Sequence, residues 1–230
     1  MVEAAAVRVL ARRGICSEEI ADEVTRAAEQ VMPQEVAAEE ARIHHNIRAL
    51  VNCMKAHVSE QAQPYVHFTL TSFDVIDTAT AWRFKQATEK GIVPTLLRLE
   101  KTLIELARRE ADTLQVGRTH GQHAEPITFG FAMAEYVSRL GGHIEAIRVA
   151  ALNLRGKISG AVGAYNASSL LIDDPEQFER EVLAELGLEP FTHSTQIVAP
   201  EFVADFIHAL ISTFGILANL ADDMLPHRPA

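Results

Sequence analysis

The side chain best suited to acid–base chemistry is His120, which lies in a short polar segment. Thr119 and Arg118 precede it, and a hydroxyl and a guanidinium beside an imidazole make it a plausible acid toward a bound dianion. His123 follows three residues later, but the glycine and proline nearby place both rings in a loop, and no third metal ligand is evident. A loop histidine is often only a solvated or capping residue, so both interpretations stay open.

A second group of polar residues lies where helices are expected to begin or end. Thr71-Ser72, followed by Asp74, has the pattern of a helix N-terminus with an acid in its first turn. Amides and hydroxyls at such a start can also hold a carboxylate. The glycine-containing run 156–163, which includes Lys157, permits a close backbone approach to a ligand. A plain connection between helices is an equally good interpretation of that run.

The adjacent residues His44, His45 and Asn46 fall inside a predicted helix. Neighbouring side chains on a helix face different directions, so only one of the two histidines can point into a given site. A solvated helix face is the default interpretation. Gln196 lies just before the last predicted helix, where a polar loop residue is also unremarkable.

Helices must position these candidates, because apolar residues recur at three- and four-residue spacing along almost the whole chain and strand-like alternation is nearly absent. The predicted fold class is therefore all-α. Gly141-Gly142 indicates a close helix crossing, and the last helix is apolar enough to be buried on several sides, inside a bundle or an oligomer. The predicted helices lie at about 18–30, 35–57, 72–113 with a kink near Gly91 and Pro94, 126–155, 176–186 and 201–224.

Residues 59–66, which contain Pro64, break the helical pattern and mark a candidate domain boundary. The predicted organisation is an N-terminal helical domain at 1–63 and a central helical-bundle domain at 64–230.

The formal net charge of −10 argues against binding to nucleic acid, which needs clustered Lys and Arg. The two cysteines show no metal-ligand or disulfide spacing, so a reducing compartment fits best. No signal peptide is recognisable, and no stretch is expected to reach the roughly 18 apolar residues of a membrane span. These features predict a cytoplasmic protein.

Several blocks of the sequence, in matching order and spacing, resemble the adenylosuccinate lyase family of the fumarase/aspartase/argininosuccinate lyase superfamily. The block Gly-Arg-Thr-His-Gly-Gln-His-Ala-Glu-Pro at 117–126 is the most specific. The others recur more loosely across the superfamily. The resemblance covers nearly the whole chain from about residue 3, and the blocks are 67–74, 117–126 with 128–130, 156–163 and 194–196.

The resemblance implies a long-helix bundle, a homotetramer with each site built from three subunits, and C–N bond cleavage by β-elimination that releases fumarate. It implies adenylosuccinate or a SAICAR-type anion as substrate, and no metal or organic cofactor. His120 matches the family's general acid, and His45 matches a second histidine of the same site. The substrate-binding positions that it implies are His44, Asn46, Thr71, Ser72, Gln196, the adjacent candidates Thr119 and Lys157, and the weaker candidate His67.

The sequence also departs from the family pattern. The family carries an Arg-Tyr phosphate-binding segment ahead of the first helix, a catalytic serine in a Ser-Ser-x-Met-Pro-x-Lys loop, and a third, C-terminal domain, none of which occurs here. Asn46 stands where the family more often has Asp, and Pro200-Glu201 where it has Arg-Asp. The expectation is a partial chain, truncated at both ends and inactive or nearly so alone. Two alternatives remain open. One is another fumarate-releasing lyase or cycloisomerase of the superfamily, and the other is a non-catalytic helical assembly module.

Overall fold

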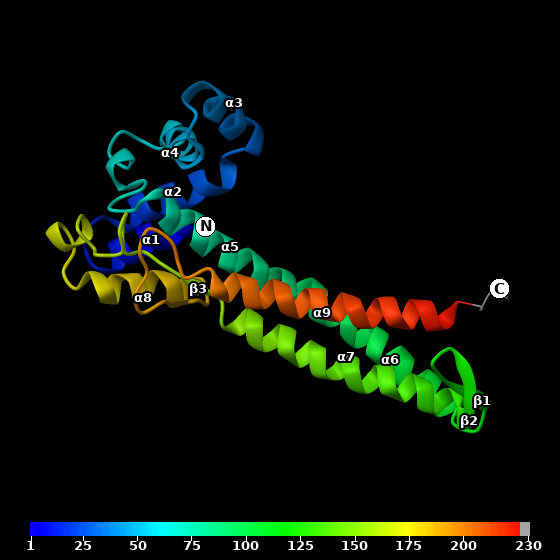
Figure 1. Ribbon diagram of the computed structural model, residues 1–230. Coiled ribbons are helices and arrows are strands. Elements are labelled where there is room, and N and C mark those ends of the chain that lie inside the picture. Colours follow the sequence, from blue (N-terminus) through cyan, green and yellow to red (C-terminus); the bar gives the residue numbers. More distant parts are fainter. Residues whose placement is uncertain (226–230) are drawn as a thin grey trace. The chain divides into compact units, whose positions relative to one another are not determined.

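The computed structural model describes residues 1–225 and confirms a mostly helical chain (Figure 1). The chain divides into two compact units. Unit 1 consists of Met1–Arg83 and Leu154–Pro200, and unit 2 of Phe84–Asn153 and the residues from Glu201 onward. The predicted domains 1–63 and 64–230 stay a prediction, and residues 226–230 of the second lie outside the described range.

Unit 1 is built around α1, whose apolar residues are almost all buried and which packs against α2 and α8. The helices predicted at about 18–30 and 176–186 are confirmed, and side chains cap both: Ser17 Oγ accepts from the Ile20 N–H, and Asp174 Oδ1 accepts from the Gln177 N–H. The elements of this unit are α1 (Val2–Arg12), α2 (Glu18–Gln30), α3 (Pro33–Ile43), α4 (Asn46–Ala56), most of α5 (Ser72–Ala87), α8 (Pro175–Glu185), the 3-10 turns Gln63–Tyr65 and Ser168–Leu170, and the parallel pair β3 (Arg155–Gly156) and β4 (Glu189–Pro190).

The single helix predicted at 35–57 is wrong, because the chain breaks it into α3 and α4. His44 adopts a left-handed conformation with φ of 58° and ends α3, and His45 then caps α4. The sequence pattern hid this break, since Ile43 and Ile47 keep the four-residue apolar spacing across it.

Unit 2 contains the end of α5, the π-helical segment Thr88–Ile92, α6 (Val93–Arg109), α7 (Phe129–Leu152) and α9 (Glu201–Met224). The predicted kink takes the form of this π-helical segment, which ends two residues before Pro94, a residue that cannot donate a backbone hydrogen bond. α6 and α7 approach each other closely at Gly130, where a Cβ would lie 2.3 Å from the Ala107 carbonyl oxygen. Gly141 meets only the flexible carboxylate of Glu100, and Gly142 faces open space.

An antiparallel hairpin joins α6 to α7, and Figure 1 shows it in green at one end of these helices. It consists of β1 (Leu114–Thr119) and β2 (Gln122–Thr128), so His123 lies in a strand and not in the predicted loop, whereas His120 lies in the turn between the strands. The alternation of a half-buried strand is missing because nearly every residue of both strands is exposed. α7 consequently begins at Phe129 instead of 126, capped by Thr128 Oγ1, which accepts from the Phe131 N–H at 3.1 Å.

The predicted last helix, α9, is confirmed, but within this chain only one face of it is buried. Phe206 and Ile216 are buried, whereas Ile211 and Phe214 are 62% and 68% exposed. In the described part of the chain it is the one helix long and apolar enough to cross a membrane, with a mean hydropathy of 1.6. This corrects the expectation that no such stretch exists, although the core helix of a soluble protein meets the same criterion.

Candidate active site

The first turn of α5 is organised by Asp74, whose side chain is buried. Its Oδ2 accepts hydrogen bonds from the backbone N–H of Thr71 at 2.8 Å and from the Thr71 hydroxyl at 3.0 Å. The predicted helix start is therefore confirmed, and the capping bonds come from the acid in the first turn. The hydroxyl of Ser72, the first residue of α5, is left free of this capping role.

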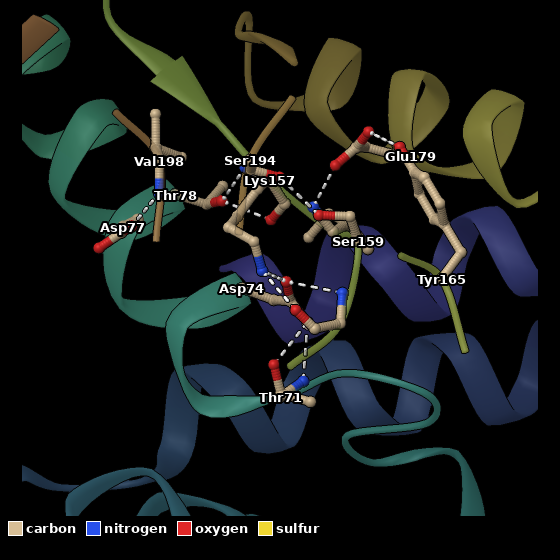
Figure 2. Close-up of polar contacts among 12 residues, drawn as sticks. Thr71, Asp74, Asp77, Thr78, Lys157, Ser159, Tyr165, Glu179, Ser194 and Val198 are labelled. Carbon is tan, nitrogen blue, oxygen red and sulfur yellow. Dashed lines mark hydrogen bonds and ion pairs between the residues drawn. The ribbon is translucent and has the colours of Figure 1, made fainter. Parts of the chain in front are cut away.

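Lys157 reaches the same carboxylate from the glycine-containing run (Figure 2). Its Nζ forms an ion pair with Asp74 Oδ1 and donates to the Gly160 carbonyl at 2.8 Å. The Gly160 N–H donates to the same carboxylate oxygen at 3.2 Å. Neither charged side chain is exposed, so the ammonium of Lys157 acts on its surroundings through these partners.

Two further residues of α5 hold the connecting segments of unit 1 (Figure 2). Thr78 Oγ1 donates to the Lys157 carbonyl at 2.9 Å and accepts from the Lys157 N–H at 3.0 Å. Asp77 Oδ2 accepts from the Val198 N–H at 2.8 Å, and burial raises the pKa of this carboxyl. Together with Asp74, these side chains have the i, i+3, i+4 spacing of one helix face. That face connects the start of α5 to the glycine-containing run 156–163 and to Val198, which precedes α9.

The glycine run also contacts the segment before α9 directly. Ser159 and Ser194 share a hydrogen bond of 2.8 Å between their hydroxyls. Gly163 has a φ of 75°, and a Cβ there would lie 2.0 Å from the Ser194 carbonyl oxygen, so this approach requires glycine. Gln196 lies in the same segment with its side chain exposed.

Glu179 on α8 supports the glycine run from inside the unit. Its carboxylate accepts from the Ile158 N–H at 2.6 Å and from the Tyr165 hydroxyl at 2.5 Å. Burial raises the pKa of Glu179, and burial together with this carboxylate raises the pKa of Tyr165. Sequence reasoning missed these supporting acids. The spacing of the acids and threonine on α5 was the available signal, whereas nothing in the sequence marked Glu179.

His45 and Ser72 lie close together in unit 1. His45 Nδ1 accepts from the Arg48 N–H at 3.2 Å, and its Nε2 is 3.5 Å from Ser72 Oγ. His44 and Asn46 are both exposed, and the Asn46 side chain accepts from the N–H of the residue that follows it. Of these three adjacent residues, the structure therefore brings only the His45 side chain to the start of α5.

His67 is held by a buried acid of α1. Its backbone N–H donates to Glu3 Oε2 at 2.8 Å, and its Nδ1 lies 2.7 Å from Glu3 Oε1. Two residues later, Thr69 has a φ of 59° and a buried hydroxyl without a hydrogen-bond partner. A β-branched residue in this region is strained. The segment leading into Thr71 is thus fixed at a conformational cost.

His120 belongs to unit 2, where it forms the hairpin turn with Gly121. Thr119 pairs with Gln122, and the two residues between them have φ values of 55° and 72°, as a two-residue type I′ turn requires. His120 and Thr119 are exposed. The exposed ring can therefore meet a ligand, and its catalytic role stays a prediction.

The remaining predicted residues belong to unit 1, so the structure divides the set between its two units. Among residues 1–225, no group of three or more His, Cys, Asp or Glu side chains could hold a metal ion. The candidate residues present hydroxyls, amides and imidazoles. These groups can bind anions and transfer protons to or from them.

Comparison with known proteins assigns the class of this chain. A lyase family model matches residues 1–226, and the chain therefore belongs to that family. Its sequence is 36% identical to the adenylosuccinate lyase of Archaeoglobus fulgidus over 223 residues, which are 96% of this chain and 48% of that protein.

Solved structures agree with the family assignment. The fumarate lyase of Mesorhizobium sp. BNC1 is similar with a TM-score of 0.85 and 31% identity, over 97% of this chain and 52% of that one. The 3-carboxy-cis,cis-muconate lactonizing enzyme of Pseudomonas putida is similar with a TM-score of 0.85 and 26% identity, over 96% and 50%. These matches confirm the predicted superfamily fold. The chain spans about half the length of the relatives it matches.

Proposed function

We propose that this chain is part of an adenylosuccinate-lyase-like enzyme that cleaves a C–N bond and releases fumarate. The observation that carries the proposal is the 36% identity to an adenylosuccinate lyase over 96% of the chain. The block at 117–126, with His120 exposed at the hairpin turn, supports it. The substrate class is a succinyl-amine anion, adenylosuccinate or a SAICAR-type compound.

In the proposed reaction a base removes the proton beside a substrate carboxylate, and the electron pair of that C–H bond forms the new C=C bond. The C–N bond breaks, its electrons pass to nitrogen, and His120 protonates the departing nitrogen. Ser72 and Gln196 donate hydrogen bonds to the carboxylates and stabilise the charge that develops, whereas the N–H and hydroxyl of Thr71 already donate to Asp74. The base is a serine of the family's Ser-Ser-x-Met-Pro loop, a pattern that these 230 residues do not contain.

A homotetramer with sites shared among subunits forms part of the same proposal. The large exposed apolar side chains of α9, such as Ile211 and Phe214, support an additional partner surface. Size-exclusion chromatography with light scattering measures the mass directly. A strict monomer at high protein concentration contradicts this part of the proposal.

Ligand binding tests the proposed function. Adenylosuccinate should raise the melting temperature, because a ligand that binds only the folded state stabilises it by mass action. Fumarate release, followed by absorbance, should be absent for these 230 residues alone. Turnover at an ordinary enzymatic rate would show that the base lies within them.

A second candidate is another lyase or a cycloisomerase of the same family. The similarity to a fumarate lyase and to a lactonizing enzyme favours it. A panel containing adenylosuccinate, other N- and S-succinyl compounds and a carboxymuconate separates the candidates by which one raises the melting temperature. No rise with any of them favours a non-catalytic assembly module.

A further inference from the structure

His45 connects the first turns of two helices in unit 1. It is the N-cap of α4, with φ of −150° and ψ of 111°, and its Nδ1 accepts from the Arg48 N–H at 3.2 Å. Its other ring nitrogen, Nε2, lies 3.5 Å from the hydroxyl of Ser72 at the start of α5. One imidazole therefore spans from a backbone donor to a side-chain hydroxyl.

The cap selects one tautomer of the ring. A neutral imidazole has one nitrogen that donates and one that accepts. Because the Arg48 N–H can only donate, Nδ1 must be the accepting nitrogen and the proton must reside on Nε2. The Nε2–H of His45 then donates to Ser72 Oγ.

This donation sets the direction of the Ser72 hydroxyl. A hydroxyl carries one proton and two lone pairs, so a lone pair that accepts from His45 leaves the O–H free to donate elsewhere. The helix start does not use that proton, since Asp74 makes the capping bonds to Thr71. A polarised chain of donors thus runs from the Arg48 N–H through the imidazole to the serine hydroxyl.

We propose that His45 is a positioning residue: its cap-fixed Nε2–H tautomer orients Ser72 so that the serine O–H donates to a carboxylate of the substrate. The inference rests on the proposed function for the identity of that anion. In this role His45 acts through Ser72 and does not exchange a proton with the substrate.

The tautomer can be measured without any ligand. In protein with ¹⁵N-labelled histidine, a long-range ¹H–¹⁵N correlation spectrum at alkaline pH distinguishes protonated from unprotonated ring nitrogens. The signals of His45 are those lost in His45→Asn. We expect an unprotonated Nδ1 and a protonated Nε2, unchanged in Ser72→Ala because the Arg48 cap sets the tautomer. A protonated Nδ1 overturns the proposal whether or not adenylosuccinate binds.

Variants separate the cap from the orientation of Ser72. Asn is a favoured N-cap residue, so His45→Asn should keep the melting temperature while removing the donor to Ser72. With adenylosuccinate as the probe, His45→Asn and Ser72→Ala should each weaken binding about tenfold, and the double variant should bind no more weakly than either. Additive losses mean that the two side chains act separately, which overturns the proposal.

The outcomes distinguish this proposal from the proposed function. If adenylosuccinate fails to bind even the unaltered protein, the proposed function fails, and the tautomer alone decides whether His45 orients Ser72. If adenylosuccinate binds and His45→Asn binds it as tightly as the unaltered protein, the proposed function stands and the positioning role is wrong.

Discussion

Lys157 and Asp74 form an ion pair in which neither side chain is exposed, although 83 residues separate them in the sequence. The pair joins the glycine-containing run to the first turn of α5. Charges removed from water are tolerated when each has a partner, so the loss of either partner should be severe.

Replacing Lys157 with Met should therefore destabilise the protein by about 3–5 kcal/mol, because the Asp74 carboxylate is left buried without its counter-charge. Urea denaturation measures the free energy of unfolding. Lys101→Met is the matched control, since Lys101 pairs with Glu105 at 3.9 Å with both side chains well exposed. That change should cost no more than about 0.5 kcal/mol. Equal effects at the two sites contradict the importance of burial.

Replacing Thr69 with Gly should stabilise the protein by about 1 kcal/mol. Thr69 has a φ of 59°, which is costly for a β-branched residue, and its buried hydroxyl has no partner. Glycine relieves both costs, although it makes the unfolded chain more flexible. The same change at Thr102, inside α6, should lower the melting temperature. A fall in the melting temperature for Thr69→Gly contradicts the strain.

The free energy of unfolding should fall as the pH rises through the titration of Glu179. Burial raises the pKa of this carboxyl in the folded protein, so the folded state retains the proton to higher pH than the unfolded state. The stabilisation that protonated Glu179 contributes to folding is complete below the unfolded pKa of about 4.3. It is lost as the pH rises through the folded-state pKa. In Glu179→Gln this part of the profile should be flat. Denaturant midpoints across the acidic range provide the measurement.

Glu181, on the same helix, should behave in the opposite way. A hydrogen bond from Arg13 lowers the pKa of this carboxyl. Its stabilisation is present above the unfolded pKa and is lost as the pH falls through the folded-state value. Glu181→Gln should therefore reduce stability at neutral pH. Profiles of the same sign for the two glutamates would refute this assignment.

The fold should not require the imidazole of His120. Asn also tolerates a positive φ, so His120→Asn should leave the free energy of unfolding within about 0.5 kcal/mol. Valine is β-branched and tolerates a positive φ poorly, so His120→Val should destabilise the hairpin by about 1–2 kcal/mol. Thermal unfolding of both variants checks this. A large loss of stability in His120→Asn would point to a structural use of the ring.

Local patterns in the sequence were sufficient for most of the helices. The hydroxyl at Ser17, the acid and proline at 174–175 and the apolar stripe of α9 each act within a few residues, so the local chain determines the helix ends and faces. The motif blocks likewise predicted the family that the comparisons confirm.

Tertiary structure decided the rest. The left-handed His44 interrupts an apolar stripe that reads as continuous, and the hairpin around His120 has no buried face to produce a strand pattern. Lys157 is buried against Asp74, 83 residues away, and Gly163 of the same run fits closely against Ser194. Such contacts depend on which distant segments pack together, and local periodicity carries no information about that pairing. The sequence by itself therefore determined the helices and the candidate residues, and only the packed chain decided which of those residues meet.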